Sequence, residues 1–181
     1  SKSELEAIRA VCDQHKLPLF IDGARLGYAL ASPENDVSIK DLARLADVFY
    51  IGGNKVGALF GEAVVIMNPA LKRDFRFMMK QRGGMLAKGR LLGLQFDTLF
   101  TGDLYRQCGQ HAVDMAMELK RGLLEKGYSL YLDSPTNQQF VILENDRMEQ
   151  IEKEVSVSFW ERYDEDHTVV RFATSWATRE A

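Results

Sequence analysis

Two short apolar runs, residues 19–21 and 48–51, are each followed by a charged residue with glycines nearby. Asp22 follows the first run, and Lys55 follows the second after a glycine pair. Short apolar strands that alternate with helices are typical of a mostly parallel sheet that is buried on both faces. In such sheets, ligands bind at the carboxyl ends of the strands. Asp22 and Lys55 therefore fall where we expect the side chains of a binding site.

An aspartate and a lysine at the ends of successive strands form the core of a pyridoxal phosphate (PLP) site. The lysine can form an imine with the cofactor aldehyde, and the aspartate can keep the pyridine nitrogen protonated so that the ring withdraws electrons. Each residue also has a simpler explanation. Lys55 in a glycine-rich turn can be a solvated side chain, and Asp22 can be the N-cap of the helical turn that follows it.

The composition is that of a soluble globular protein of one domain or slightly more. The 181 residues are 46% hydrophobic and 27% charged, with a net charge of -3, which argues against a nucleic-acid-binding face. Cys12 and Cys108 fall in helix-like segments and are expected to be reduced packing residues, which points to the cytoplasm. No apolar run approaches the roughly 18 residues of a membrane span, so we expect no membrane partner.

The chain divides into two blocks. In the first, a capping box of Ser3 and Glu6 predicts a helix start, and the strands at 19–21 and 48–51 are followed by a third at 63–67. The second block is helix-rich and then mixed, with a helix starting near Met85. Its other expected elements are the longest helix at 103–126, strands at 129–132, 140–142, 155–160 and 168–173, and a short helix at 148–153.

Four segments resemble, in order, those of L-threonine aldolases, within the beta-eliminating lyase group of fold-type-I PLP enzymes. They are residues 19–27 (LFIDGARLG), 52–63 (GGNKVGALFGEA), 80–90 (KQRGGMLAKGR) and 171–176 (RFATSW). The resemblance extends over nearly the whole chain and depends on the order of the four segments. It implies an α/β fold in which residues 1–100 are the C-terminal portion of the PLP-binding large domain and 101–181 are a smaller α+β domain.

The resemblance also implies roles for four residues. Lys55 matches the imine-forming lysine, Asp22 the partner of the pyridine nitrogen, and Arg25 a residue beside the cofactor. Arg171 matches the arginine that holds the substrate carboxylate, a bidentate task that suits a guanidinium. As simpler alternatives, Arg25 can pair with Asp22 or Glu62 on the surface, and Arg171 can face solvent on an edge strand.

Two positions depart from the pattern of the group. Asn54 stands where members often have a small hydroxyl residue that reaches the cofactor phosphate. Leu86 stands where many carry an arginine that can reach the cofactor of a neighbouring subunit, and Lys88 and Arg90 are candidate substitutes. Both departures concern the phosphate contacts more than the imine.

Members of this group are about twice as long as this chain, in line with two domains of typical size. We therefore expect the chain to be the C-terminal half of such an enzyme. In the group, the N-terminal half carries the loop that holds the cofactor phosphate and the residue that stacks on the ring. The chain alone is therefore expected to bind PLP weakly or not at all and to be inactive.

The implied activity is the cleavage of a β-hydroxy-α-amino acid, such as threonine, to glycine and an aldehyde. Two alternatives stay open: another PLP reaction on the same scaffold, such as β-elimination or transamination, and a non-catalytic fragment that only packs or binds partners. The expected partners are an amino acid substrate and further copies of the chain, as a dimer or tetramer. The apolar residues of the helical stretch 75–100 suggest such an interface.

Overall fold

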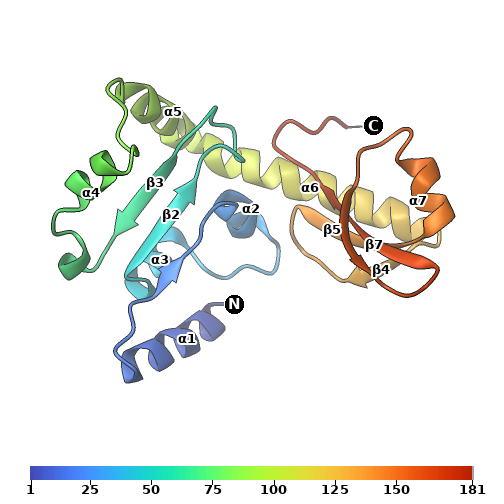
Figure 1. Cartoon of the computed structure of the whole chain (residues 1–181), viewed down its shortest axis with the longest axis horizontal. Coiled ribbons are helices and arrows are strands. Elements are labelled where there is room, and N and C mark those ends of the chain that lie inside the picture. The colour runs from blue at the N-terminus through green and yellow to red at the C-terminus, as the bar shows by residue number, and fades with distance from the viewer. Residues whose placement is uncertain (181) are drawn as a thin grey trace.

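The computed structural model describes residues 1–180 and contains two β-sheets that a long helix connects (Figure 1). The first sheet has the strand order β1-β2-β3, and the second has the order β4-β5-β7-β6. The strands are β1 (Phe20–Ile21), β2 (Val48–Gly52), β3 (Glu62–Ile66), β4 (Ser129–Leu132), β5 (Gln138–Glu144), β6 (Ser158–Arg162) and β7 (His167–Ala173).

Seven α-helices and two short 3-10 helices surround these sheets in the part of the chain that the structure describes. They are α1 (Lys2–Gln14), α2 (Leu26–Ala31), α3 (Ile39–Leu45), η1 (Pro69–Leu71), α4 (Phe75–Gln81), α5 (Arg90–Phe100), η2 (Thr101–Asp103), α6 (Leu104–Glu125) and α7 (Asn145–Ile151). Figure 1 shows α6 running from the end of α5 to the second sheet. Because α6 contacts both α2 and the strands β4 and β5, the division at residue 100 stays a prediction.

The direction of β3 differs from the parallel arrangement that the sequence pattern indicates. β1 and β2 pair in parallel, whereas β2 and β3 pair antiparallel. The connection at 53–61 contains no helix and is shorter than the dozen or more residues that a parallel crossover needs. The chain can therefore return only in the opposite direction.

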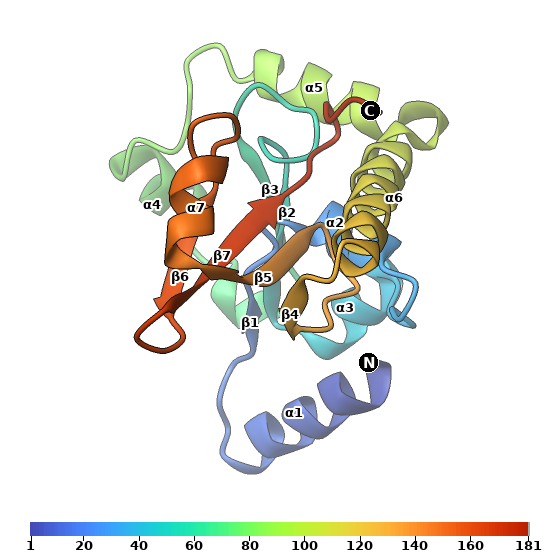
Figure 2. The same cartoon turned by 90° about the vertical axis from the view of Figure 1, so that its right-hand side faces the viewer.

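Within residues 1–180, the strands of the first sheet are buried on one face only. Phe49 and Ile51 are buried against α2 and α3, which contact β2. Phe20 and Val64 point to the opposite face, as the register and the alternation of strand side chains require, and are 58% and 46% exposed. No helix or strand among residues 1–180 buries these two side chains. In the view of Figure 2, β5 and β7 of the second sheet lie in front of β2 and β3.

The second sheet packs its inner face against helices. Val141, Leu143 and Val170 form a small core that Leu123 of α6 and Met148 of α7 cover. All pairs in this sheet are antiparallel, and β7 lies between β5 and β6. The predicted α+β character of this part of the chain is therefore confirmed.

Two helix starts differ from their predictions. Ser1 and Glu4, rather than Ser3 and Glu6, form the capping box of α1. Ser1 and Glu4 have the same three-residue spacing as Ser3 and Glu6, and a cap at Ser1 lets the helix begin at Lys2. The helix expected from near Met85 begins at Arg90, because residues 82–89 with their three glycines form turns.

A close backbone contact joins the ends of β1 and β2. The N–H of Gly52 donates to the carbonyl oxygen of Gly23 at 2.9 Å. A Cβ on Gly23 would lie 1.7 Å from the carbonyl oxygen of Tyr50, and one on Gly52 would lie 2.3 Å from that of Ala24. Glycine is therefore required at both positions, and the residues that follow the two strands are held side by side.

We predict that Gly52→Ala destabilises the fold by about 1–3 kcal/mol, the usual cost of overpacking a close contact, because its Cβ would meet backbone atoms. Gly93→Ala is the matched control. Gly93 lies in α5 with open space around it, and the substitution should stabilise the helix by roughly 0.5–1 kcal/mol. Urea unfolding measures both values. Equal free energies of unfolding for Gly52→Ala and the parent protein would contradict the contact.

Candidate functional site

Asp22 and Lys55 follow the carboxyl ends of two parallel strands, so the structure brings them to one edge of the first sheet. Asp22 comes directly after β1. Lys55 lies in the turn after β2, and its positive charge is close enough to contribute to the lowered pKa of Asp22. Within residues 1–180, neither Asp22 nor Lys55 forms an ion pair. Their carboxylate and amine are therefore both available to a third group.

Two uncharged groups donate hydrogen bonds to the Asp22 carboxylate. The Tyr50 hydroxyl donates to Asp22 Oδ1, and the Ala24 N–H donates to the same oxygen at 3.0 Å. These two hydrogen bonds lower the pKa of Asp22, the bond from Tyr50 most strongly, while burial acts in the opposite direction. The same bond to Asp22 raises the pKa of Tyr50 to about 12. Asp22 is therefore ionised, and Tyr50 is protonated, at neutral pH.

Asp22 does not cap the helix that follows it, so the N-cap alternative is wrong. The N-cap of α2 is Arg25, and no side chain bonds to the first turn there. Tyr50 is a site residue that the sequence reasoning missed. The alternation of side chains along a strand could have identified it. Because Phe20 is paired with Val48, Asp22 and Tyr50, two residues further along each strand, lie on the same face of the sheet.

The turn that carries Lys55 is fixed at its backbone. Gly53 accepts hydrogen bonds from the N–H groups of Val56 and Ala58 at 2.9 and 3.0 Å. The Gly53 N–H donates to Glu62 Oε2 at 2.9 Å across the hairpin. The turn is therefore ordered by its own polar groups, while the Lys55 side chain is half-buried. That partial burial argues against a purely solvated lysine.

Two buried tyrosines support this turn from the core side. Tyr28 of α2 donates to the Lys55 carbonyl oxygen, and Tyr105 of α6 donates to that of Gly52 at 2.9 Å. Their side chains are 2% and 4% exposed. An unpaired hydroxyl would be costly at such burial, so the turn and the core stabilise each other. Sequence reasoning missed both, because tyrosines in helical segments resemble ordinary packing residues.

Arg25 and Arg171 belong to different parts of the fold. Arg25 is half-buried at the start of α2, three residues after Asp22, and forms no ion pair within residues 1–180. The alternative of a surface pair with Asp22 or Glu62 is therefore wrong. Arg171 lies on β7 of the second sheet, whereas Asp22 and Lys55 belong to the first.

Arg171 is not on an edge strand, because β7 pairs on both sides. Its guanidinium lies over the Trp160 ring, with 5.7 Å between Cζ and the ring centroid. Its Nη1 donates to Gln138 Oε1 at 3.1 Å, and its buried Nε has no partner among the described residues. The group is thus oriented by two neighbours and retains unused donors, which is the arrangement that a carboxylate ligand needs.

A large cavity lies away from the four predicted site residues. A cavity of about 750 Å³ lies at the end of the second sheet, and its lining includes Lys126, Arg147, Tyr163 and His167. None of the four predicted site residues lines it. Asn54 and Leu86, where the pattern of the family changes, are both exposed. This cavity and the four predicted site residues therefore lie at different places in the molecule.

Two classes of site find no support in the part of the chain that the structure describes. Residues 1–180 contain no group of three or more His, Cys, Asp or Glu side chains that could hold a metal ion. None of the helices over the same range combines the length and apolar character that a membrane crossing requires.

Comparison with known proteins identifies the family of the chain. Residues 1–146 match the family of beta-eliminating lyases. The low-specificity L-threonine aldolase of Pseudomonas aeruginosa is 30% identical over 149 residues, which are 82% of this chain and 43% of that protein. The chain spans about half the length of the relatives it matches.

Solved structures give the same result for the fold. The threonine aldolase of Leishmania major is 46% identical with a TM-score of 0.95, over 98% of this chain and 52% of that one. A serine palmitoyltransferase from Sphingomonas wittichii, 15% identical, has a TM-score of 0.65 over 97% of this chain and 47% of that one, a likeness of fold alone. The chain therefore has the fold of the fold-type-I PLP enzymes and belongs to the beta-eliminating lyase family, whose members depend on PLP.

Proposed function

We propose that the full-length protein is a PLP-dependent aldolase that cleaves β-hydroxy-α-amino acids such as threonine to glycine and an aldehyde. The observation that carries the proposal is the position of Lys55 beside an ionised Asp22 at one sheet edge, in a chain 46% identical to a threonine aldolase. A lysine and a carboxylate in this relation suit a cofactor with an aldehyde and a ring nitrogen.

The residues of this chain fit that cofactor. When bound, PLP supplies an electron-withdrawing ring that stabilises the charge released when a bond at the substrate Cα breaks. Lys55 is the amine for its aldehyde, because it lies in an ordered turn and forms no ion pair within residues 1–180. Asp22 holds a proton at the ring nitrogen, since the bonds from Tyr50 and Ala24 keep it ionised.

Arg171 is the proposed site for the substrate carboxylate, and Arg25 is proposed to lie beside the cofactor. Trp160 and Gln138 orient the Arg171 guanidinium, and its Nε is free to donate. A bidentate guanidinium fixes the orientation of a carboxylate as well as its position. The substrate carboxylate would then bind Arg171 of the second sheet, while the substrate amine and Cα face Asp22 and Lys55 of the first.

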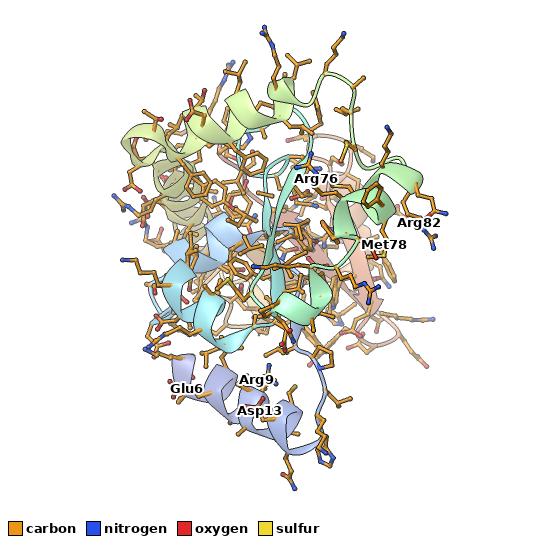
Figure 3. All side chains as sticks on the ribbon, turned by 90° about the vertical axis from the view of Figure 1, so that its left-hand side faces the viewer. Glu6, Arg9, Asp13, Arg76, Met78 and Arg82 are labelled. Carbon is orange, nitrogen blue, oxygen red and sulfur yellow. The ribbon has the colours of Figure 1, made fainter. Side chains whose placement is uncertain are left out.

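We also propose a homo-oligomer, a dimer or tetramer, in the cytoplasm. Apolar side chains of α4, α5 and the turn before β3 are strongly exposed, among them Leu59 at 86% and Phe77 at 77%. Figure 3 shows Met78 and Arg82 on the outer side of α4, and Met78 is 47% exposed. Exposed apolar patches of this kind mark interfaces. Sedimentation of the full-length protein as a monomer would contradict the proposed oligomer.

The proposed cytoplasmic location is supported by the cysteines. Cys12 and Cys108 are free, as in proteins of reducing compartments.

The first prediction from this proposal concerns Lys55. Borohydride reduction of the full-length protein with PLP should label Lys55, and Lys55→Ala should abolish both labelling and activity. Lys40→Ala, a change on the exposed surface of α3, is the control and should keep both. Product analysis with threonine and serine then distinguishes the reactions. Glycine and an aldehyde indicate an aldolase, a keto acid with ammonia indicates β-elimination, and labelling without turnover indicates a non-catalytic fragment.

Arg171→Ala should raise the KM for the amino acid by about one to two powers of ten, because it removes a charge-assisted bidentate contact. The absorbance of the bound cofactor in the resting enzyme should stay. Arg171→Lys should recover only part of the affinity, since an ammonium cannot form the same fork. Unchanged amino-acid kinetics in Arg171→Ala would make the arginine a purely structural residue.

Tyr50→Phe should raise the pKa of Asp22 towards the ordinary value of about 3.9, because the strongest donor to the carboxylate is lost. A lowered pKa stabilises the folded state above the unfolded-state pKa, and that contribution is lost as pH falls through the folded pKa. The variant should therefore lose less stability on acidification. Carbon-13 NMR titration measures the pKa. Asp164, whose pKa His167 lowers, is the internal reference and should not move.

A further inference from the structure

Thr174, the residue after β7, attaches that strand to the long helix α6. Its Oγ1 donates to the Ala112 carbonyl oxygen of α6 at 2.5 Å. Its backbone N–H donates to the Asn137 carbonyl oxygen at 3.0 Å, and the Asn137 side-chain amide donates to the Thr174 carbonyl oxygen at 2.7 Å. Thr174 is 9% exposed and Asn137 is 3% exposed, so these bonds are shielded from water. The residues that precede β5 and follow β7 are therefore held to each other and to α6.

This attachment lies next to Arg171 and to a residue that orients it. Arg171 precedes Thr174 by three positions, and β7 ends at the residue between Phe172 and Thr174. Gln138, which accepts a hydrogen bond from Arg171 Nη1 at 3.1 Å, follows Asn137 directly. A shift of the end of β7 relative to α6 would therefore displace the guanidinium.

The same stretch of α6 also reaches the lysine turn. Tyr105 donates to the Gly52 carbonyl oxygen at 2.9 Å, three residues before Lys55. Between the two attachments, Gly109 packs so closely on α2 that a Cβ there would lie 2.3 Å from a carbonyl oxygen of that helix. Tyr105 and Ala112 are seven positions apart on one helix, a span of about 10 Å. α6 is therefore a rigid connection between the lysine turn and the arginine strand (Figure 1).

We propose that Thr174 is a positioning residue for the reaction: by attaching β7 to α6, it fixes Arg171 at a constant separation from the Lys55 turn. This inference rests on the proposed roles of Arg171 and Lys55. A substrate whose carboxylate binds one sheet, while its Cα is at a cofactor on the other, reacts efficiently only if that separation is maintained. Because the two residues belong to different sheets, strand pairing cannot maintain it, and the attachment to α6 does.

Thr168 provides a matched control on the same strand. It lies three residues before Arg171, as Thr174 lies three residues after it. Thr168 is 6% exposed, and its Oγ1 donates to Asn145 Oδ1 at 2.8 Å. That partner belongs to α7 rather than to α6. Replacing either threonine by valine removes one buried hydroxyl from a side chain of similar shape, but only the change at Thr174 breaks the attachment to α6.

Steady-state kinetics of the full-length holoenzyme test the proposal. Thr174→Val should raise the KM for the amino acid about fivefold, with a smaller change in kcat, because the arginine is no longer held in place. Thr174→Ser keeps the hydroxyl and should have a KM within about twofold of the parent. Thr168→Val should lower the melting temperature as Thr174→Val does and leave KM unchanged. An unchanged KM in Thr174→Val, an equal rise in both valine variants, or no rescue by serine overturns the proposal.

A double-mutant cycle shows whether the effect depends on Arg171. In the Arg171→Ala background, Thr174→Val should leave KM unchanged, because there is no guanidinium left to position. If Arg171→Ala raises KM and the effect of Thr174→Val persists without the arginine, the proposed function stands and this inference fails. If Arg171→Ala alone leaves KM unchanged, the carboxylate assignment has failed, and the positioning role fails with it.

Hydrogen exchange tests the attachment independently of activity. Thr174→Val should accelerate exchange in a peptide that covers 174–178, and Thr168→Val should leave that exchange unchanged. Equal exchange in Thr174→Val and the parent overturns the attachment. Should Thr174→Val not fold, His111→Ala takes its place. Partly buried His111 of α6 donates to the Thr178 carbonyl oxygen at 2.7 Å, so its loss should raise KM, and an unchanged KM in that variant overturns the proposal.

Discussion

The backbone contact between Gly23 and Gly52 is the constraint on which the rest of the site depends. The 2.9 Å hydrogen bond between them continues the parallel pairing of β1 and β2 beyond the strands themselves. Because parallel strands end at the same edge of a sheet, Asp22 and the Lys55 turn leave it side by side. Any side chain at either glycine would separate the two backbones. The glycines near the charged residues thus serve to bring two segments together, rather than to make either one flexible.

Two buried tyrosines connect the Lys55 turn to the hydrophobic core. Tyr28 and Tyr105 reach the lysine turn from different helices, and the carbonyl groups of that turn satisfy hydroxyls that have almost no access to water. An unsatisfied hydroxyl in this position would cost about 1–3 kcal/mol. The turn therefore cannot move without leaving buried polar groups unpaired. A loop that would be mobile on a protein surface is held here with the rigidity of a core segment, and Lys55 is positioned accordingly.

The sequence predicted the pair Asp22 and Lys55 because strand ends follow from local patterns of apolar residues and glycine. It did not predict Tyr50 or Tyr28, because their roles depend on the pairing register and on contacts between residues 27 or 28 positions apart. The direction of β3 was accessible in principle, since the length of the connection decides it. The exposure of Phe20 was not, because an apolar strand has the same pattern whether or not a further layer covers it.

Asp22 differs from Asp41 and Asp47 in the groups that bind its carboxylate. Asp41 is paired with Lys2 and Arg44, and Asp47 with Arg9, so cations within the chain neutralise their charges. The pKa of Asp22 is also lowered, but its two bonding partners, a tyrosine hydroxyl and a backbone N–H, carry no charge. Its negative charge is stabilised without being cancelled, and it lies at an exposed strand end. A carboxylate in that state can hold a proton on a neighbouring ring nitrogen, whereas an ion-paired one has already used its charge.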